Sequence, residues 1–349
     1  MNPTTTSIAA TLALIAALLA VGVSADFHTE RVHLLDTFKT AAGCKTHLFR
    51  GALPLDSSSL EFVYEPLVSA MEEAAKKVDV NVHAKDLRII DLSLLHPDSE
   101  KEAPEIEAER NFFEQNPSKG FFFSVPIQGS SANPSFLNTK AQREIATGFN
   151  AWSKESLPSL IDAIRYLLTS DETVLLNNSP SLEQFEVLGF THSDFANALN
   201  VLLGEQQGPC ADVAIYFHCQ HGMDRTGEVA ASYLLRYGGF LQQYDGSSDS
   251  FTKDRPTSLQ QVVDMNEQVL GRHITAHNQR ALSWMCLSLA VSGMEEFESL
   301  NCSIDYYVDS EESEEVEDAI FSASPSLLSP SLVSLFLSFL FFATRFMYH

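Results

Sequence analysis

The chain has 349 residues, 45% of them hydrophobic, which is enough to bury the core of one large domain or two smaller ones and excludes a largely disordered chain. Its 46 acidic residues outnumber its 22 basic residues, and the formal net charge at pH 7 is −24. This acidity argues against nucleic acid and anionic membrane surfaces as main partners, because both repel a negatively charged protein.

The N-terminus carries an uncharged apolar stretch from Ile8 to Val21, followed by the small residues Val23-Ser24-Ala25. The stretch has the length of the hydrophobic region of a secretory signal, and small residues are typical of the cleavage site. A membrane anchor is the alternative, although the stretch is short for crossing a bilayer. We therefore expect residues 1–25 to be a signal peptide and the chain to enter the secretory pathway, for the cell exterior or surface.

Strand-like and helix-like segments alternate along the rest of the chain. Compact apolar runs predict strands, and apolar residues at helical spacing predict helices. In chain order the segments are a strand at 86–94, a helix at 102–116, a strand at 120–127, a helical region at 140–168, a short strand near 173–180, a helix at 191–203, a strand at 212–219, and helices at 226–237 and 278–293. This order predicts an α/β domain with a central, mostly parallel sheet flanked by helices.

The run from Tyr216 to Gly227, YFHCQHGMDRTG, joins a predicted strand to a predicted helix. A helix start offers unpaired N–H groups and the positive end of its dipole, and a loop wound around one centre points further N–H groups inward. The loop residues between Cys219 and Arg225 are Gln220, His221, Gly222, Met223 and Asp224. Arg225 adds a planar fork that matches two phosphate oxygens. The run therefore predicts a phosphate cradle.

Cys219 is expected at the floor of this cradle. The field that holds a phosphate also favours a thiolate, so the pKa of Cys219 should lie below the usual value of about 8.5. A thiolate beside a bound phosphate is a nucleophile aimed at phosphorus. We expect the Thr226 hydroxyl to hydrogen bond to the sulfur and His218 to order the loop from behind. Gly222 lets the backbone turn, and Gly227 permits close packing of the helix start.

The His-Cys-x5-Arg-Thr pattern of residues 218–226 resembles the cysteine-dependent phosphatase superfamily, which includes tyrosine and dual-specificity phosphatases, myotubularins and inositol-phosphate phosphatases. The segments HLFRGALP at 47–54 and GFFFSVPI at 120–127 resemble the corresponding segments of small dual-specificity members. The Asp-Arg-Thr version of the loop is most like myotubularins. The longer motif HC-x-x-G-x-DRTGE at 218–228, with N-x-x-A-x-x-W-x-C-x-x-L at 278–289, resembles secreted phosphatase-like proteins of unicellular eukaryotes. The resemblance covers roughly residues 46–290. It implies hydrolysis through a phosphorylated Cys219. We expect no cofactor.

The chain departs from the family pattern in two places. The loop after the strand at 120–127 usually carries a general-acid Asp, but here it reads QGSSANPS and holds no carboxylate. The long interval between Pro126 and Cys219 suggests a helical insertion at about 138–180. We therefore assign the general acid to Asp224, whose position beside the phosphate should raise its pKa. The alternative is that Asp224 only braces the loop by accepting backbone N–H groups; Asp194 and Asp212 are then the reserve candidates.

These features predict an exported phosphomonoesterase acting on phosphotyrosine-type or general phosphomonoester substrates. The loop lacks the Lys or Arg that phosphoinositide-selective loops tend to carry, although His221 could serve as a cation at acidic pH or simply make a loop hydrogen bond. A phosphoinositide or inositol-phosphate phosphatase is one alternative. A pseudophosphatase that binds phosphorylated ligands without turnover is another, and a purely structural surface protein is the third.

The C-terminus combines an acidic spacer at 304–324 with an apolar segment at 325–349. Small residues, a short spacer and an apolar end resemble a glycolipid-anchor signal, whereas Arg345 near the end suits a transmembrane helix with a tiny tail. Either would attach the phosphatase-like domain at 26–303 to a membrane. Secretion without an anchor is the remaining option.

Five cysteines allow two disulfides and one free thiol in an exported protein, and the free thiol is expected to be Cys219. The sequence indicates no pairing among the other four. Asn177 and Asn301 begin glycosylation sequons. No metal site is expected, because His273 and His277, four residues apart, give only a weak ligand signal.

Overall fold

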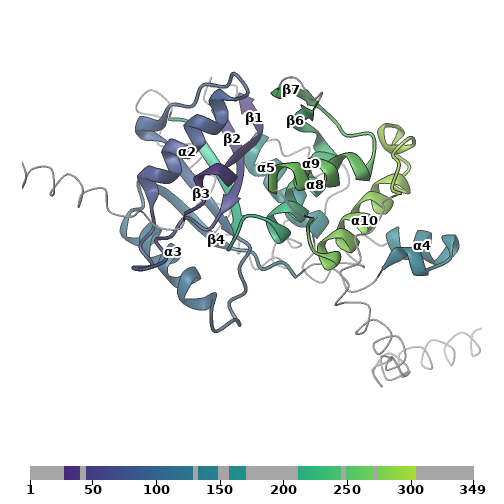
Figure 1. The fold of residues 1–349 in the computed structure, drawn as a ribbon, viewed down its shortest axis with the longest axis horizontal. Coiled ribbons are helices and arrows are strands. Elements are labelled where there is room, and N and C mark those ends of the chain that lie inside the picture. The colour runs from purple at the N-terminus through teal and green to yellow at the C-terminus, as the bar shows by residue number, and fades with distance from the viewer. Residues whose placement is uncertain are drawn as a thin grey trace, which may run out of the picture. The chain divides into compact units, whose positions relative to one another are not determined.

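A five-stranded sheet with the order β1-β2-β5-β3-β4 forms the centre of the fold (Figure 1). The computed structural model describes residues 27–39, 45–128, 133–147, 157–169, 211–244, 249–270 and 273–303. The strands are β1 (His33–Lys39), β2 (Lys45–Ala52), β3 (Arg88–Ser93), β4 (Gly120–Ser124) and β5 (Val213–Cys219). Within this sheet β1 pairs antiparallel with β2, and β2, β5, β3 and β4 are parallel to one another. The predicted fold class, α/β with a mostly parallel sheet, is confirmed.

Strand β5 lies in the middle of the sheet, and all seven of its residues are buried. Such an apolar, β-branched and aromatic run is typical of a strand covered on both faces. At its carboxyl end, Cys219 pairs with Ala52 of β2, and His218 pairs with Ser93 of β3. The carboxyl ends of parallel strands form the crevice where ligands bind in open α/β sheets, and this edge places Cys219 there.

Helices cover both faces of the sheet (Figure 1). Helix α2 (Tyr64–Lys76) packs over one face, and α3 (Ala103–Gln115) adds Phe113 to the same apolar cluster. The other face carries the larger cluster. Its helices are α5 (Leu157–Thr169), α8 (Asp224–Tyr237), α9 (Leu259–Leu270) and α10 (Ala276–Ala290), with α4 (Thr139–Ala146) beside α10. A hairpin of β6 (Gly239–Tyr244) and β7 (Asp249–Asp254) lies next to β1, and short 3-10 turns occupy Thr29–Arg31, Ala84–Asp86, Pro134–Phe136 and Glu295–Phe297.

Most predicted elements recur at the expected positions. Strands β3, β4 and β5 and helices α3, α8 and α10 match the predicted segments. Helix α8 starts at Asp224, two residues before the predicted start, and ends where Gly238 adopts a φ of 71°. The α5 residues that predicted a helix are all buried: Leu160, Ile161, Ile164, Leu167 and Leu168. The predicted strand near 173–180 and helix at 191–203 lie outside the described residues.

The prediction that Cys219 is the free thiol is confirmed among the described cysteines. Cys286 of α10 forms a disulfide with Cys302, 16 residues further along the chain. The disulfide ties the end of the described region back to the core. Cys44 and Cys210 lie outside the described residues.

None of the helices in the described ranges combines the length and apolarity that a bilayer-spanning segment needs. The predicted signal peptide and the C-terminal apolar segment lie outside these ranges.

Candidate active site

The loop between β5 and α8 turns tightly at Gly222, which has a φ of 67°. A Cβ at this position would lie 2.5 Å from the carbonyl carbon and oxygen of Gly51 in β2. Only glycine fits such a left-handed conformation against a neighbouring backbone. At the start of α8, a Cβ on Gly227 would come within 3.1 Å of the Ile274 side chain. The two glycines therefore allow the close packing that shapes the loop.

Cys219 is buried at the base of this loop, with 4% of its surface exposed. Burial alone would raise its pKa, but several interactions together hold the pKa below its usual value. The first is a hydrogen bond from the Thr226 hydroxyl, followed by the charge of Arg225 and the backbone N–H groups of Thr226 and Met223. These are the groups that the sequence placed around the sulfur. They favour a thiolate over a thiol.

Arg225 is held by Glu102, which the sequence analysis did not single out. Its Nη1 donates to Glu102 Oε2 at 3.0 Å and its Nη2 to Oε1 at 2.6 Å, a two-pronged pairing of fork and carboxylate. Nη1 also donates to the Leu94 carbonyl at 3.1 Å, and Glu102 accepts the His96 N–H at 2.7 Å. The guanidinium is therefore fixed in one plane beside Cys219 before any phosphate arrives.

A second arginine, Arg50 of β2, hydrogen bonds to the backbone of the loop. It is 3% exposed, donates from Nη2 to the Gly222 carbonyl at 3.0 Å, and donates from Nη1 to Asn266. Asn266 in turn donates to the Gly227 carbonyl at 3.1 Å. Burial lowers the pKa of Arg50 to about 10, whereas the negative charge on Cys219 opposes this shift. Arg50 thus places a second positive charge near the sulfur.

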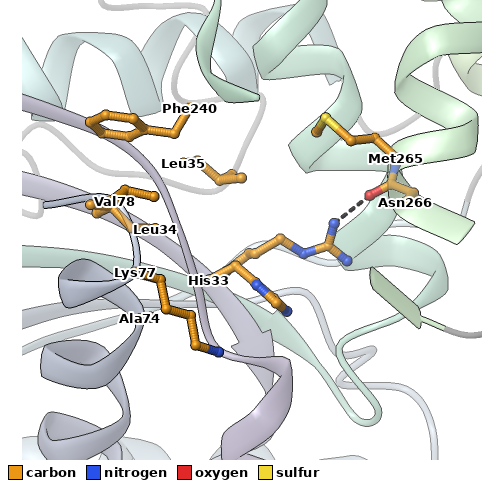
Figure 2. Close-up of a pocket in the computed structure, with 10 residues that line it drawn as sticks. His33, Leu34, Leu35, Ala74, Lys77, Val78, Phe240, Met265 and Asn266 are labelled. Atoms are coloured by element: carbon orange, nitrogen blue, oxygen red, sulfur yellow. Dashed lines mark hydrogen bonds between the residues drawn. The ribbon is translucent and has the colours of Figure 1, made fainter. Parts of the chain in front are cut away.

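Arg50 also lines a pocket between β1, α2, the hairpin and α9. Figure 2 shows other side chains that line this pocket. Its apolar lining includes Phe240 and Met265, and its polar lining includes His33 and Lys77. Burial lowers the pKa of His33 to about 3, with further contributions from the charges of Arg50 and Lys77. A neutral His33 therefore lies next to the arginine that holds the loop.

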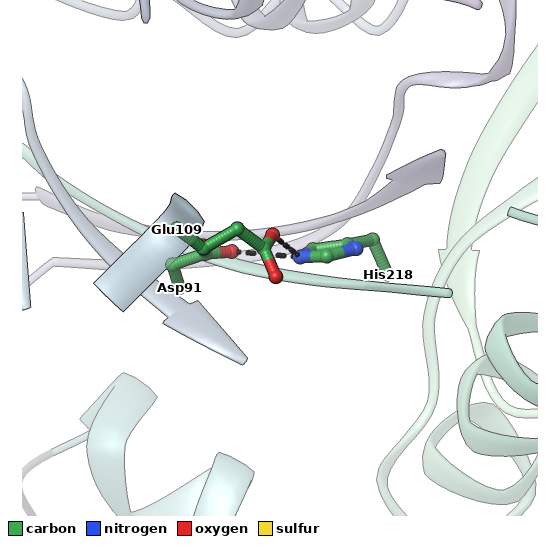
Figure 3. Close-up of side chains that lie close together, drawn as sticks. All are labelled: Asp91, Glu109 and His218. Atoms are coloured by element: carbon green, nitrogen blue, oxygen red, sulfur yellow. Dashed lines mark ion pairs between the residues drawn. The ribbon is translucent and has the colours of Figure 1, made fainter. Parts of the chain in front are cut away.

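His218 is enclosed by two carboxylates that come from other elements (Figure 3). Its Nε2 lies 2.8 Å from Glu109 Oε1 of α3 and 3.1 Å from Asp91 Oδ1 of β3, and all three side chains are fully buried. Burial would lower the pKa of His218, but Glu109 and Asp91 raise it well above its usual value. Burial raises the pKa of Glu109 to about 7, and the positive His218 limits this rise. The two carboxylates therefore hold the side chain of His218, the residue that directly precedes Cys219.

The same three side chains bring potential metal ligand atoms within 4.8 Å of one another. A protonated imidazole has no lone pair on Nε2 to offer a metal ion. The raised pKa of His218 therefore favours the ion-pair interpretation. That the chain needs no metal stays a prediction.

Asp224 occupies the first position of α8, and its carboxylate faces a helix start. Its Oδ1 accepts the backbone N–H of Thr275, just before α10, at 3.0 Å. This is the kind of contact that the bracing role requires. Its assignment as the general acid stays a prediction.

The two reserve candidates for the general acid differ in position. Asp212 lies just before β5, at the opposite end of the strand from Cys219, about 23 Å away for seven residues of extended chain. There it accepts the backbone N–H groups of Lys45 and His83 at 3.3 and 3.0 Å. It cannot reach a phosphate at Cys219, so this candidate is wrong. Asp194 lies outside the described residues.

The remaining loop residues contact segments distant in sequence. The His221 carbonyl accepts a hydrogen bond from Arg31 at 2.8 Å. Burial, followed by the charges of Arg31 and Lys101, lowers the pKa of the His221 imidazole. A cationic His221 would thus need a more acidic medium than its usual pKa implies. The Gln220 side chain accepts from Lys101 Nζ at 3.0 Å and donates to Glu105 at 3.0 Å.

Comparisons with known proteins identify no family for the chain. No family model matches, and no curated protein matches. Among solved structures, the chain is similar to a Legionella phosphoinositide phosphatase at 11% sequence identity and a TM-score of 0.21. The match covers 79% of this chain and 33% of the Legionella chain, so the chain spans about a third of the length of that protein. A likeness this weak carries no argument about function.

Proposed function

We propose that the chain is a cysteine-dependent phosphomonoesterase. The observation that carries this proposal is the buried Cys219, whose pKa is lowered by Thr226, Arg225 and loop N–H groups that would also hold a phosphate. A structural cysteine in an apolar core has its pKa raised, so this arrangement favours a nucleophile.

The proposed reaction has two steps. The Cys219 sulfur attacks phosphorus, forming an S–P bond as the P–O bond breaks and the leaving-group oxygen takes a proton. Water then attacks the phosphocysteine, which releases inorganic phosphate and restores the thiolate. The Arg225 fork and loop N–H groups neutralise the charge on the equatorial oxygens, and Thr226 stabilises the sulfur as it leaves.

We also propose export, with residues 1–25 as the signal peptide, 26–303 as the catalytic domain, 304–324 as the spacer and 325–349 as a membrane attachment. The Cys286–Cys302 disulfide supports this, because disulfides persist mainly in oxidising compartments. N-terminal sequencing of the mature protein would test the first part, with Asp26 as the expected first residue.

The proposed substrates are phosphotyrosine-type or general phosphomonoesters, and one observation favours inositol phosphates or phosphoinositides as a second candidate. Arg31 donates to the His221 carbonyl and Lys101 to the Gln220 side chain, so two cations from outside the loop border the cradle. In a chain of net charge −24 such cations would favour a substrate with a second anionic group.

Turnover of para-nitrophenyl phosphate by the wild type and by Cys219→Ser tests the proposal. We expect hydrolysis that the substitution abolishes. A folded wild type that binds phosphate but hydrolyses no ester would instead indicate a pseudophosphatase. Phosphopeptides, phosphoinositides and phytate tested side by side, with Lys101→Met as a comparison, separate the substrate classes. Phytate as the best substrate, weakened by Lys101→Met, would favour the second candidate.

A further inference from the structure

Two carboxylates border the loop from the beginning of α3. Glu102 immediately precedes the helix and binds Arg225 through both of its oxygens. Glu105 follows three residues later, and residues three apart on a helix are neighbours on one face. Glu105 Oε1 accepts from the Gln220 Nε2 at 3.0 Å, and Gln220 directly follows Cys219. Both carboxylates therefore contact residues of the loop itself.

The two carboxylates differ in their hydrogen-bond partners. Both oxygens of Glu102 are paired with Arg225, whereas Glu105 Oε2 is buried without a hydrogen-bond partner in the part of the chain that the structure describes. A buried carboxylate oxygen without a donor is costly when charged, but a protonated oxygen can donate. Gln220 holds the other oxygen in place. One oxygen of Glu105 is thus held by a residue of the loop, and the other has no hydrogen-bond partner among the described residues.

The pKa of Glu105 is raised overall, mainly by burial and against most of the charges around it. Burial raises the pKa of Glu105, and the nearby Glu102 adds to the rise, whereas Gln220, Lys101 and His218 oppose it; the net shift is upward. The pKa of Glu102 is lowered despite its burial, mainly by Arg225. Environments that push the pKa values of two neighbouring carboxyl groups apart are typical of acid and base assignments in active sites.

The other acidic groups near the cradle are committed elsewhere. Asp224 accepts the Thr275 N–H, and Asp91 and Glu109 are fully buried around His218. The loop after β4 holds no carboxylate in its sequence QGSSANPS. Glu105 differs from these groups in that it contacts the loop through Gln220 and keeps one oxygen without a hydrogen-bond partner among the described residues.

We propose that Glu105 is the general acid of the phosphatase reaction. As the Cys219 sulfur forms its bond to phosphorus, the electron pair of the breaking P–O bond goes to the leaving-group oxygen, which takes the proton from Glu105. The Glu105 carboxylate then accepts a proton from the water that attacks the phosphocysteine. Gln220 acts as a positioning residue that orients the Glu105 carboxyl group. This inference rests on the proposed phosphatase activity.

The test compares Glu105→Gln with wild type on two esters of different leaving-group ability. With an alkyl phosphate, such as phenethyl phosphate, kcat/KM should fall ~10²–10⁴-fold, the usual contribution of a positioned acid. With para-nitrophenyl phosphate, whose leaving group needs little protonation, the loss should be much smaller. The basic limb of the kcat/KM pH profile should also disappear. Equal losses on both esters with an intact basic limb would overturn the assignment.

Three controls make the result specific. Glu107→Gln changes an exposed carboxylate on the same helix that pairs with Arg110, and both esters should be hydrolysed as in wild type. Asp224→Asn should lower both rates alike if Asp224 braces the loop, and a selective alkyl-ester loss there would move the assignment to Asp224. Gln220→Ala should shift the basic limb without altering the fold, as checked by thermal melting. A wild type inactive on both esters would contradict the phosphatase proposal itself.

Discussion

A buried carboxyl group lies near each end of β5, Asp212 at the amino end and Glu109 at the carboxyl end, but the two charges are compensated differently. At the amino end, Asp212 accepts the N–H groups of Lys45 and His83 and lies 3.4 Å from His47 Nε2. Burial opposes ionisation there, yet the interactions with His47 and then with His83 lower the pKa of Asp212 to about 2. At the carboxyl end, donors are fewer and the pKa of Glu109 rises to about 7. At one end the carboxylate is held ionised by its donors, and at the other a carboxyl group has its pKa raised into the neutral range.

Catalysis is expected at the carboxyl end of β5. A carboxylate with all its lone pairs occupied stays ionised over the physiological range and contributes only stability. The carboxyl end instead combines Cys219, with its pKa lowered, and Glu109 and Glu105, with pKa values raised. Shifts in opposite directions within one crevice are typical of functional sites.

The largest expected effect comes from removing the carboxylate that holds Arg225 at the carboxyl end. Glu102→Gln keeps the shape of the side chain but removes the charge that fixes the guanidinium plane. Losing one partner of a partly buried ion pair costs roughly 1–3 kcal/mol, so kcat/KM should fall about 10- to 100-fold. Steady-state kinetics with para-nitrophenyl phosphate measures this, with Glu107→Gln as the matched control. Unchanged kcat/KM would mean that Arg225 needs no support.

A smaller effect concerns stability at the amino end of the strand. The folded pKa of Asp212 lies below its usual 3.8, so its stabilisation is complete above about pH 4 and disappears as the pH falls toward 2. Asp212→Asn should lower the free energy of unfolding by ~1–2 kcal/mol at pH 7 and make it less dependent on pH between 4 and 2. Urea denaturation at several pH values checks this. The kcat of Asp212→Asn should equal that of wild type.

The smallest effect has the opposite sign and concerns Glu109. Its folded pKa of about 7 lies above the usual 4.5, so its contribution is complete below pH 4.5 and disappears as the pH rises through 7. His218, whose pKa is also raised, contributes in the same direction. Wild type should therefore be less stable at pH 8 than at pH 5 by ~1 kcal/mol, and Glu109→Gln should reduce that difference. A steeper loss in the variant would contradict the assignment.

The parts of the site that were predicted are those local in sequence. His218, Cys219, Gly222, Arg225 and Thr226 lie within nine residues, and their spacing carries the chemistry without knowledge of the fold. Strands β3, β4 and β5 and helices α3, α8 and α10 could be read from periodicity for the same reason.

The parts that were missed depend on register between distant segments. Glu102 precedes helix α3, and Glu105 and Glu109 lie on it. The sequence predicts this helix, but the pairing of β3 with β5 decides that it lies beside the loop. Arg50 was part of a recognised segment, but its contact with Gly222 follows from the pairing of β2 with β5. Helix α2 and the β6-β7 hairpin were not predicted either, although Met71 and Leu67 of α2 are fully buried.

The central claim, that Cys219 is an ionised nucleophile in a phosphate site, can be measured without any substrate. Iodoacetamide alkylates thiolates, so the rate of Cys219 modification against pH, followed by mass spectrometry of its peptide, reports the pKa of the thiol. We predict a midpoint below the usual value of about 8.5, alkylation slowed by inorganic phosphate, and a higher midpoint in Thr226→Ala. A midpoint at or above 8.5 with no protection by phosphate would contradict the account.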